Sequence, residues 1–375
     1  MDALKLASEL VAVPSVSAQS NVDVSRIVQA TLAADGFDVE WLEFDDPNGV
    51  RKANVIGRKG NGAGGVAYFA HTDTVPADSW SCRDHGPTQP TVRDDRLYGR
   101  GSCDMKGSLA TFIAAASRLP AEQLRQPIYV VSTADEEVGY RGAADVVQRS
   151  ELYRELVAGN ARGLIGEPTE LAVVHGHKGT YGFRAISRGR AAHSSTRDGV
   201  NANLAMIPFL AEMRRIHDET VADPQWQNAE FEPPWVSWNI GVNDHTHAVN
   251  ITAPQSICTV YYRPMPGMDP DRLLERAQRA AAECGLDFEI TWQAGPLYCD
   301  PQSAYIQELL QVTGQAKSQT VAYGTDGVLY SAVRQIAVLG PGSIRQAHTD
   351  DEWIALDQLR RGTDLYETLI RRWCA

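Results

Sequence analysis

Helical patterns alternate with short apolar runs through the first half of this 375-residue chain, and this alternation constrains its fold more than any other feature. The helical segment VSRIVQATLAADG is followed by the apolar run GVAYFAHTD, and the helical segment SLATFIAAASRL is followed by PIYVVSTAD and ARGLIGEP. Such alternation is typical of α/β proteins, in which helices cover a largely parallel sheet. We therefore predict an α/β fold built on a mainly parallel sheet.

The middle of the chain follows a different pattern. Its segments indicate a strand (TYGFRAISRGR), a helix (NANLAMIPFLAEMRRIHD), two strands (WVSWNIGVN and SICTVYYRP), a helix (PDRLLERAQRAAAECG) and a strand (DFEITW). This βαββαβ order is the ferredoxin-like pattern, which forms a compact unit by itself. Because a chain of this length exceeds the usual size of a single core, we predict a larger domain in two parts, residues 1–173 and 293–375, with a ferredoxin-like domain inserted at 174–292.

The charge balance limits the partners of the chain. It carries 35 Lys and Arg side chains against 47 Asp and Glu, a net charge of −12. This balance argues against nucleic acid or an anionic membrane as the main partner. The N-terminus lacks the basic start and continuous apolar core of a signal peptide, and the six cysteines include no CxxC pair. We therefore expect a cytoplasmic protein with reduced thiols.

Potential metal ligands follow four of the apolar runs and occur in one glycine-rich loop. They are His71 and Asp73, Glu136 and Glu137, Glu167, His348 and, in the loop GRGSCDMKG, Asp104. In an open α/β sheet, ligands bind beyond the carboxyl ends of the strands. Each of these residues alone has an ordinary role as a cap or turn residue. If all of these residues were only caps or turn residues, their occurrence at every one of these sites would be a separate coincidence. We therefore predict a metal site at this edge of the sheet.

The types of residue indicate which metal the site would hold. Two histidines and several carboxylates without thiolates suit zinc or a similar divalent ion, and two ions sharing a carboxylate would lie about 3.5–4 Å apart. Asp73 lies two residues after His71 and is expected to fix the orientation of that imidazole. Of Glu136 and Glu137, one would bind metal while the other takes a proton from the attacking water.

Eight motifs give the chain a resemblance to a known family. They are HTDTVP, GRGSCDMKG, TADEE, GEPT, HKG, AHSS followed by GVNAN, RPMPGMD and LGPGSIRQAH. In this order they resemble the co-catalytic zinc metallopeptidase family that includes acetylornithine deacetylase, succinyl-diaminopimelate desuccinylase, aminoacylase and glutamate carboxypeptidase. Within it, IGEPT, RPMPGMD and GPGSIRQAH are most similar to the acetylornithine deacetylases. The resemblance implies a zinc-peptidase-like catalytic domain with an inserted dimerisation domain, and a homodimer.

The resemblance also implies a role for each candidate metal-site residue. One zinc ion would be held by His71, Asp104 and Glu167, and the second by Asp104, Glu137 and His348. Two zinc ions per subunit are expected, with Co²⁺ or Mn²⁺ as possible substitutes. Glu136 would be the general base, and Asp73 would orient His71.

Further residues acquire a role through the same resemblance. His193 of AHSS would stabilise the oxyanion from the partner subunit. Arg263 and Asn250 would contact the carboxylate side of the substrate, and Gly324 and Thr325 would lie in a substrate loop. These roles describe a site for a small molecule that is completed by a second chain.

The implied function is that of a di-zinc amidohydrolase that removes an acyl group, most simply acetyl, from an N-acyl amino acid. Acetylornithine or a relative such as acetylcitrulline is the expected substrate, with a role in arginine biosynthesis. A desuccinylase or carboxypeptidase of the family is the alternative, and a catalytically dead binding protein is disfavoured by the intact ligand set. The chain has Thr325-Asp326-Gly327 where acetylornithine deacetylases have Thr-Glu-Ala, so Asp326 either meets a cationic substrate side chain or is a buried turn acid.

Overall fold

The computed structural model describes residues 1–246 and 248–375 and divides the chain into two compact units. Unit 1 comprises Met1–Gly176, Cys299–Gln319 and Thr325–Ala375, and unit 2 comprises His177–Tyr298 and Thr320–Gly324. These bounds differ by a few residues from the boundaries predicted at 173/174 and 292/293. Short strands occupy the division, namely β8 (Val174–His177), β13 (Leu297–Tyr298) and β14 (Gln319–Val321), and the sequence pattern did not reveal them.

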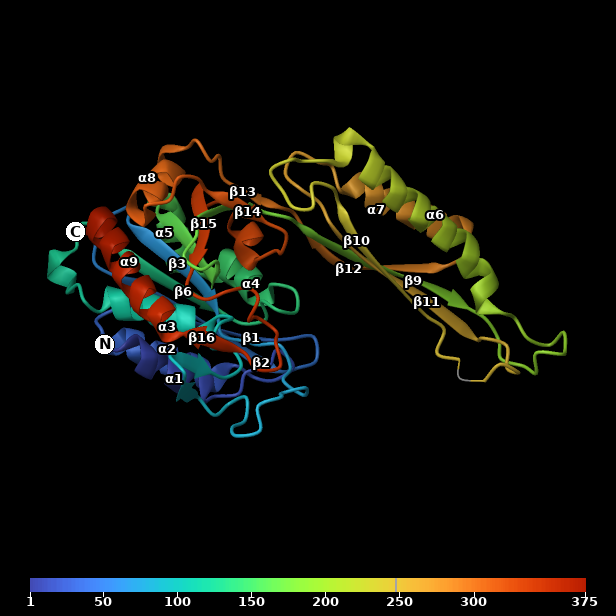
Figure 1. Cartoon of the computed structure of the whole chain (residues 1–375), viewed down its shortest axis with the longest axis horizontal. Coiled ribbons are helices and arrows are strands. Elements are labelled where there is room, and N and C mark those ends of the chain that lie inside the picture. Colours follow the sequence, from blue (N-terminus) through green and yellow to red (C-terminus); the bar gives the residue numbers. More distant parts are fainter. Residues whose placement is uncertain (247) are drawn as a thin grey trace. The chain divides into compact units, whose positions relative to one another are not determined.

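Unit 1 is built on a mixed sheet whose strands run in the order β1-β2-β6-β3-β7-β15-β8; Figure 1 labels β1, β2, β3, β6 and β15 among them. The central strands are β6 (Ile128–Thr133), β3 (Val66–His71), β7 (Arg162–Pro168) and β15 (Gln335–Gly340), and each pair of neighbours among them is parallel. The flanking strands β1 (Asp38–Asp45), β2 (Arg51–Lys59) and β8 add antiparallel pairs. The predicted α/β fold is confirmed, and the parallel pairing is concentrated at the centre of the sheet.

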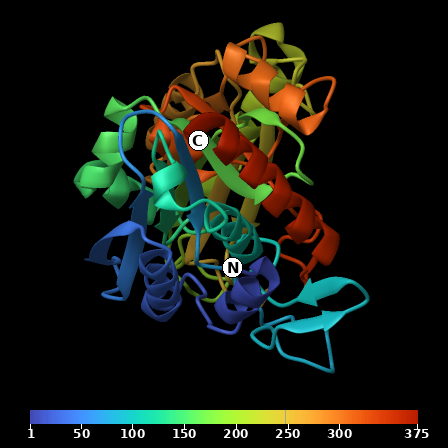
Figure 2. The same cartoon turned by 90° about the vertical axis from the view of Figure 1, so that its left-hand side faces the viewer.

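The central strands are buried on both faces, which explains their continuous apolar sequences. Every residue of β3 and β6 is buried, as expected for parallel strands that helices cover on both sides. On one side, α3 (Lys106–Ala116) packs against both α1 (Ala3–Val11) and α9 (Leu356–Cys374). Figure 2 faces this helical layer, with α9 in red and α1 in dark blue.

The remaining elements of unit 1 connect or flank this framework. They are α2 (Val22–Ala34), β4 (Thr91–Arg93), β5 (Arg96–Tyr98), η1 (Ala121–Gln123), α4 (Arg141–Arg149), α5 (Glu151–Ala158), α8 (Ala304–Thr313), η3 (Asp326–Tyr330) and β16 (Trp353–Ala355). Strands β16, β5 and β4 form a small separate sheet. Among the described helices of the whole chain, none combines the length and apolar character that a membrane crossing requires.

Unit 2 has the predicted βαββαβ order. Its elements are β9 (Thr180–Arg188), α6 (Ala202–Ala222), η2 (Pro224–Trp226), β10 (Ser237–Asn243), β11 (Gln255–Arg263), α7 (Asp271–Glu283) and β12 (Asp287–Ala294). The strands form an antiparallel sheet in the order β10-β11-β9-β12. Helices α6 and α7 lie side by side on one face of it (Figure 1), and the buried side chains between helices and sheet form a core separate from that of unit 1.

Candidate active site and metal centre

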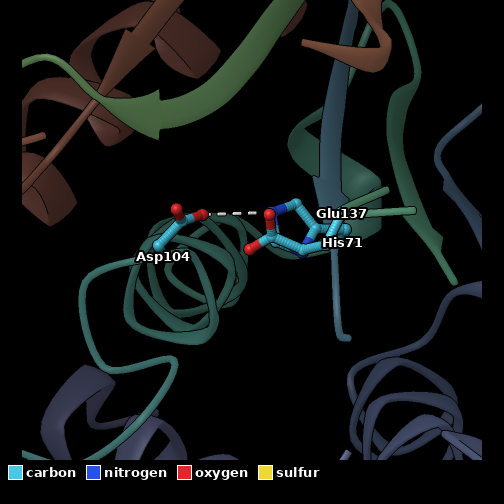
Figure 3. Close-up of side chains that lie close together, drawn as sticks. All are labelled: His71, Asp104 and Glu137. Carbon is cyan, nitrogen blue, oxygen red and sulfur yellow. Dashed lines mark hydrogen bonds and ion pairs between the residues drawn. The ribbon is translucent and has the colours of Figure 1, made fainter. Parts of the chain in front are cut away.

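The five side chains predicted as metal ligands converge at the carboxyl ends of the central strands of unit 1. They are His71 at the end of β3, Glu137 after β6, Glu167 near the end of β7, Asp104 just before α3, and His348 between β15 and β16. Figure 3 shows His71, Asp104 and Glu137, whose side chains point toward one another from three separate segments. Parallel pairing makes this convergence possible, because it brings the carboxyl ends of β3, β6, β7 and β15 to one edge.

The Asp104 carboxylate lies between the two histidines. Its Oδ1 atom is 3.1 Å from Nε2 of His71, and its Oδ2 atom is 3.3 Å from Nε2 of His348. Oε1 of Glu167 is 3.6 Å from the same His71 nitrogen, and Oε1 of Glu137 is 3.1 Å from the same His348 nitrogen. The ligand atoms therefore form two groups, each with one imidazole and one further carboxylate, and Asp104 belongs to both.

These spacings and donor types fit divalent cations. Two ligands bound to one tetrahedral zinc ion at about 2.0–2.1 Å are roughly 3.3 Å apart, which is close to the distances between the ring nitrogens and the carboxylate oxygens. Imidazole and carboxylate without thiolate suit zinc and similar ions. The ligand atoms of His71, Glu136 and Glu167 also lie within 4.8 Å of one another, so Glu136 borders the same centre.

Burial is the main cause that raises the pKa values of three acids in this cluster, and repulsion between the carboxylates adds to it. Burial, together with the charges of neighbouring carboxylates, raises the pKa values of Glu136 and Glu137, and raises the pKa of Glu167 to about 8. Hydrogen bonding to Asp104 and Glu137 raises the pKa of His348 to about 10. A bound divalent cation would offset this crowding of negative charge, which is a second reason why the residues fit a metal centre.

Asp73 is placed differently from the sequence-based expectation. The ring nitrogen Nδ1 of His71 lies 2.9 Å from the backbone carbonyl oxygen of Asp73 and 3.6 Å from its carboxylate. The carboxylate instead accepts hydrogen bonds from the backbone amides of Glu136 at 3.0 Å and Glu137 at 3.3 Å, and from the Ser17 hydroxyl at 2.7 Å. One residue therefore orients His71 through its main chain and holds the two glutamates through its side chain.

Asp135, the first acid of the TADEE segment, has a partner away from the metal centre. Asp135 has a positive φ of 56° and forms an ion pair with Lys52 at 2.8 Å, and both side chains are buried. The Lys52 ammonium also donates to the backbone carbonyls of Ser17 and Gln19. Asp135 therefore points away to Lys52, and of the three consecutive acids only Glu136 and Glu137 face the candidate metal centre.

Asp326 and Thr325 form the start of η3 in unit 1. The Asp326 carboxylate is buried and accepts hydrogen bonds from the hydroxyls of Tyr330 at 3.1 Å and Thr133 at 3.4 Å. Thr325 caps the short helix through a hydrogen bond from the Gly327 amide. Of the two interpretations of Asp326 from the sequence, this geometry favours the buried turn acid.

In unit 2, Arg263 is held at one end of the sheet. Its Nη1 atom donates to Oγ1 of Thr180 at 2.7 Å, and its guanidinium carbon lies 4.9 Å from the centre of the Tyr261 ring. A Cβ atom on Gly324 would lie 3.3 Å from Nη1 of Arg263 and 3.1 Å from Oγ1 of Thr180. Gly324 therefore packs closely against this pair, and a Cβ atom there would require the pair to shift by a few tenths of an ångström.

His193 and Asn250 lie together at the other end of the same sheet. The Ser194 amide donates to the Asn250 carbonyl at 3.0 Å, and the Thr252 amide donates to the Ala192 carbonyl. These bonds continue the pairing of β9 and β11 beyond Arg188 and Gln255. Because the nine residues of β11 span roughly 26 Å at about 3.3 Å per residue, the structure separates Asn250 from Arg263, with which the resemblance had grouped it.

Comparison with known proteins gives the site its context. Residues 67–372 match the family described as Peptidase family M20/M25/M40. The chain belongs to this family. Membership in M20/M25/M40 makes it a metal-dependent hydrolase of amide bonds, in agreement with the converging imidazole and carboxylate ligands.

Individual members of the M20/M25/M40 family match almost the whole chain. Acetylornithine deacetylase from Myxococcus xanthus is 32% identical over 98% of this chain and 96% of that protein. Acetylornithine deacetylase from Vibrio vulnificus (strain CMCP6) is also 32% identical, over 95% and 93% of the two chains. A metallo-carboxypeptidase of the M20 family from Sulfolobus solfataricus has a similar fold, with a TM-score of 0.78, 17% identity and 99% of each chain covered.

Several residues that hold the predicted site residues in place had no recognisable signal in the sequence. Lys52 pairs with Asp135, Thr180 holds Arg263, and Glu352 accepts a hydrogen bond from the backbone amide of Asp104. Each acts across a long stretch of sequence, and each is a common residue type in an unremarkable local pattern. The motif HKG, which precedes Thr180, was the only hint that this segment carries more than a strand.

Proposed function

We propose that this chain is a di-zinc deacylase that removes the acetyl group from an N-acetyl amino acid, with acetylornithine as the favoured substrate. The observation that carries this proposal is the Asp104 carboxylate, which lies 3.1 and 3.3 Å from the two histidine nitrogens, in a chain 32% identical to acetylornithine deacetylases over nearly its full length. His71, Asp104 and Glu167 would hold one zinc ion, and Asp104, Glu137 and His348 would hold the other.

The protein's own residues divide the chemistry between them. When bound, the metal ions supply Lewis acidity toward the scissile carbonyl and the attacking water. Glu136 takes the proton from the attacking water and returns it to the departing amine. Glu136 is 7% exposed and its carboxylate borders the ligands. Burial raises its pKa, which suits a group that must both accept and release a proton. Asp73 holds the Glu136 amide and thereby fixes the start of that side chain.

Arg263 is the residue that selects an amino-acid substrate. A guanidinium can bind a carboxylate through two parallel hydrogen bonds. Thr180 and Tyr261 fix the side chain from two directions, so the group is ordered before substrate arrives. A substrate α-carboxylate is the expected partner for such a cation. Gly324 and Thr325 belong to the substrate loop.

We propose that the protein works as a homodimer in which His193 and Asn250 reach the active site of the partner subunit. In one chain, these residues and Arg263 lie at opposite ends of a sheet roughly 26 Å long, too far apart to contact the same small molecule. Strand β10 is an edge strand, which can pair with another chain. Exposed apolar side chains lie near this edge and on α6, namely Val242, Leu204 and Ile207. Two-fold pairing through this surface is the simplest symmetry.

Mixing two inactive variants tests the shared site. After verified subunit exchange between His193→Ala and Glu136→Ala, each mixed dimer contains one site with both an intact Glu136 and a His193 from the partner. Random exchange makes half the dimers mixed, so activity should recover to about a quarter of the wild-type value. Recovery no higher than that of the separate variants would show that His193 does not act from the partner subunit.

The cellular setting belongs to the same proposal. The six cysteines are all free thiols, four of them buried, which supports a reducing cytoplasm. Release of ornithine from its acetylated form would place the enzyme in arginine biosynthesis. The net charge of −12 supports a small-molecule partner over nucleic acid or an anionic membrane.

A substrate panel tests the proposed function directly. Zinc-loaded protein is assayed with N-acetyl-L-ornithine, N-acetyl-L-citrulline, N-succinyl-diaminopimelate and a dipeptide. We expect the acetylated amino acids to have the highest kcat/KM. Preference for the succinylated compound or the dipeptide would favour the alternative activities of the family, and hydrolysis of none of them by metal-loaded protein would contradict the proposal.

A further inference from the structure

One buried carboxylate outside the candidate ligand set contacts the segment that carries Asp104. Glu352 is 1% exposed. Its Oε1 atom accepts hydrogen bonds from the backbone amides of Cys103 at 2.8 Å and Asp104 at 3.0 Å. Its Oε2 atom accepts from the Gly101 amide at 3.0 Å and from Nη1 of Arg100 at 2.9 Å. Both oxygens of one side chain therefore bind a single short loop.

The loop that Glu352 binds has little freedom to adopt another backbone conformation. Gly101 has a positive φ of 83°, and the Lys106 amide donates to its carbonyl at 2.9 Å, which begins α3. A Cβ atom on Gly107 would lie only 2.2 Å from the Ser102 carbonyl oxygen. The backbone of this loop is therefore tightly folded against the start of α3, and its inward-pointing amides need an acceptor because they are buried.

The same residue connects this loop to the segment that carries His348. Glu352 follows His348 by four positions, and its carbonyl accepts the Gly99 amide at 3.0 Å. The next residues form β16, which pairs with β5 and places Trp353 opposite Tyr98. Two ligand-bearing segments that lie far apart in the sequence are thus joined at Glu352, through its main chain and its side chain.

We infer that Glu352 is a positioning residue of the metal centre, which fixes the Asp104 carboxylate between the two histidines by binding the amides of residues 101, 103 and 104. This inference rests on the proposed metal centre. A carboxylate is required for the task, since it accepts hydrogen bonds at both oxygens. A glutamine would present its NH₂ group to backbone amides or to Arg100 in either orientation, and the loop would shift to relieve that contact.

The test compares Glu352→Gln with a matched variant, Glu40→Gln. Glu40 lies on the outer strand β1 and also accepts backbone amides at both oxygens, from Glu151 at 2.9 Å and Leu152 at 3.4 Å. Zinc affinity is measured by competition with a chromogenic chelator, and the geometry of the site by the visible absorption spectrum of the Co²⁺-loaded protein. We expect Glu352→Gln to bind zinc about 10- to 100-fold more weakly and to change the Co²⁺ spectrum, while Glu40→Gln matches the wild type in both.

A purely structural role would give a different result. Glu352→Gln would then lower the thermal midpoint but retain wild-type zinc affinity and Co²⁺ spectrum, and the inference would be overturned. Amide hydrogen exchange in the wild-type protein gives a test without substitution: the amides of Gly101, Cys103 and Asp104 should exchange as slowly as those of β3, and rapid exchange would also overturn it. A wild type that itself binds no metal would overturn the proposed function and, with it, this inference, whereas wild-type zinc affinity in Glu352→Gln would overturn the inference alone.

Discussion

The backbone amide of Glu136 donates a hydrogen bond of 3.0 Å to Oδ1 of Asp73, so the proposed base and the proposed orienting residue of His71 are directly joined. The second carboxylate oxygen of Asp73 accepts the Glu137 amide. These two bonds therefore fix the end of β3 relative to the end of β6, next to the candidate ligands that His71 and Glu137 supply. These bonds explain how adjacent glutamates can be held with their side chains in different roles.

Replacing Asp73 should impair the site without removing a ligand. In Asp73→Asn, one acceptor oxygen becomes an NH₂ group that faces a backbone amide or Ser17, so we expect kcat or zinc affinity to fall about 10- to 100-fold. Ser17→Ala removes only one of the hydrogen bonds to the carboxylate and should have a smaller effect. Equal kinetics and zinc affinity for Asp73→Asn and the wild type would contradict this role.

The two adjacent glutamates should respond differently to the same substitution. Glu136→Gln should lower kcat by about two to four orders of magnitude while zinc content stays at the wild-type level, because the residue moves a proton and holds no metal. Glu137→Gln should lose zinc, since its carboxylate belongs to the His348 group. Zinc analysis and turnover are measured on the same samples. Loss of zinc from Glu136→Gln but not from Glu137→Gln would reverse the two assignments.

The preference in kcat/KM for a substrate with a free α-carboxylate over its amide should depend on Arg263. Arg263→Met should lower kcat/KM for N-acetyl amino acids by about 10- to 100-fold, the value of a charged hydrogen-bonded pair, and should leave the corresponding amides nearly unchanged. Arg184→Met is the matched control, because Arg184 lies on β9 of the same sheet and pairs with Glu289 at the surface. Equal losses on acids and amides would rule out Arg263 as the carboxylate-binding residue.

His177 makes stability depend on pH in the acid range. Burial lowers its pKa to about 4, with a further contribution from the charge of Arg263, whereas an unfolded histidine titrates near 6.5. Between these values the unfolded chain binds more protons than the folded one, so the free energy of unfolding falls as pH decreases from about 6.5 to 4. The shift corresponds to roughly 3 kcal/mol.

The variant His177→Gln isolates this contribution. It removes the titrating ring, so its free energy of unfolding should fall less than that of the wild type over the same pH range, whatever its stability at pH 7. Denaturant unfolding at several pH values measures both slopes. Parallel curves for the two proteins would show that His177 titrates similarly in the folded and unfolded chains.

Much of the architecture could be predicted from the sequence because it depends on local patterns. The continuous apolar runs of β3 and β6 indicate strands buried on both faces, and residues at the ends of parallel strands must meet at one edge. The βαββαβ order of unit 2 followed from periodicity in the same way. The convergence of His71, Glu137 and Glu167 is a consequence of topology that a sequence pattern can anticipate.

The supporting contacts could not be predicted, because they depend on long-range packing. Arg100 and Glu352 lie 252 positions apart, and Lys52 meets Asp135 only once β2 and β6 have paired. The division of labour in Asp73, with its carbonyl near His71 and its carboxylate on the two amides, depends on a difference of less than 1 Å between alternative contacts. No local pattern contains that information.

Whether two metal ions share Asp104 is tested by the zinc content per chain after dialysis, measured for the wild type, His71→Ala, His348→Ala and Asp104→Ala. If Asp104 is shared between two ions, the wild type should bind two zinc ions, each histidine variant should retain about one, and Asp104→Ala should lose both or bind them far more weakly. A wild type that binds no zinc, or an Asp104→Ala variant that still holds two ions as tightly as the wild type, would contradict the two-metal centre.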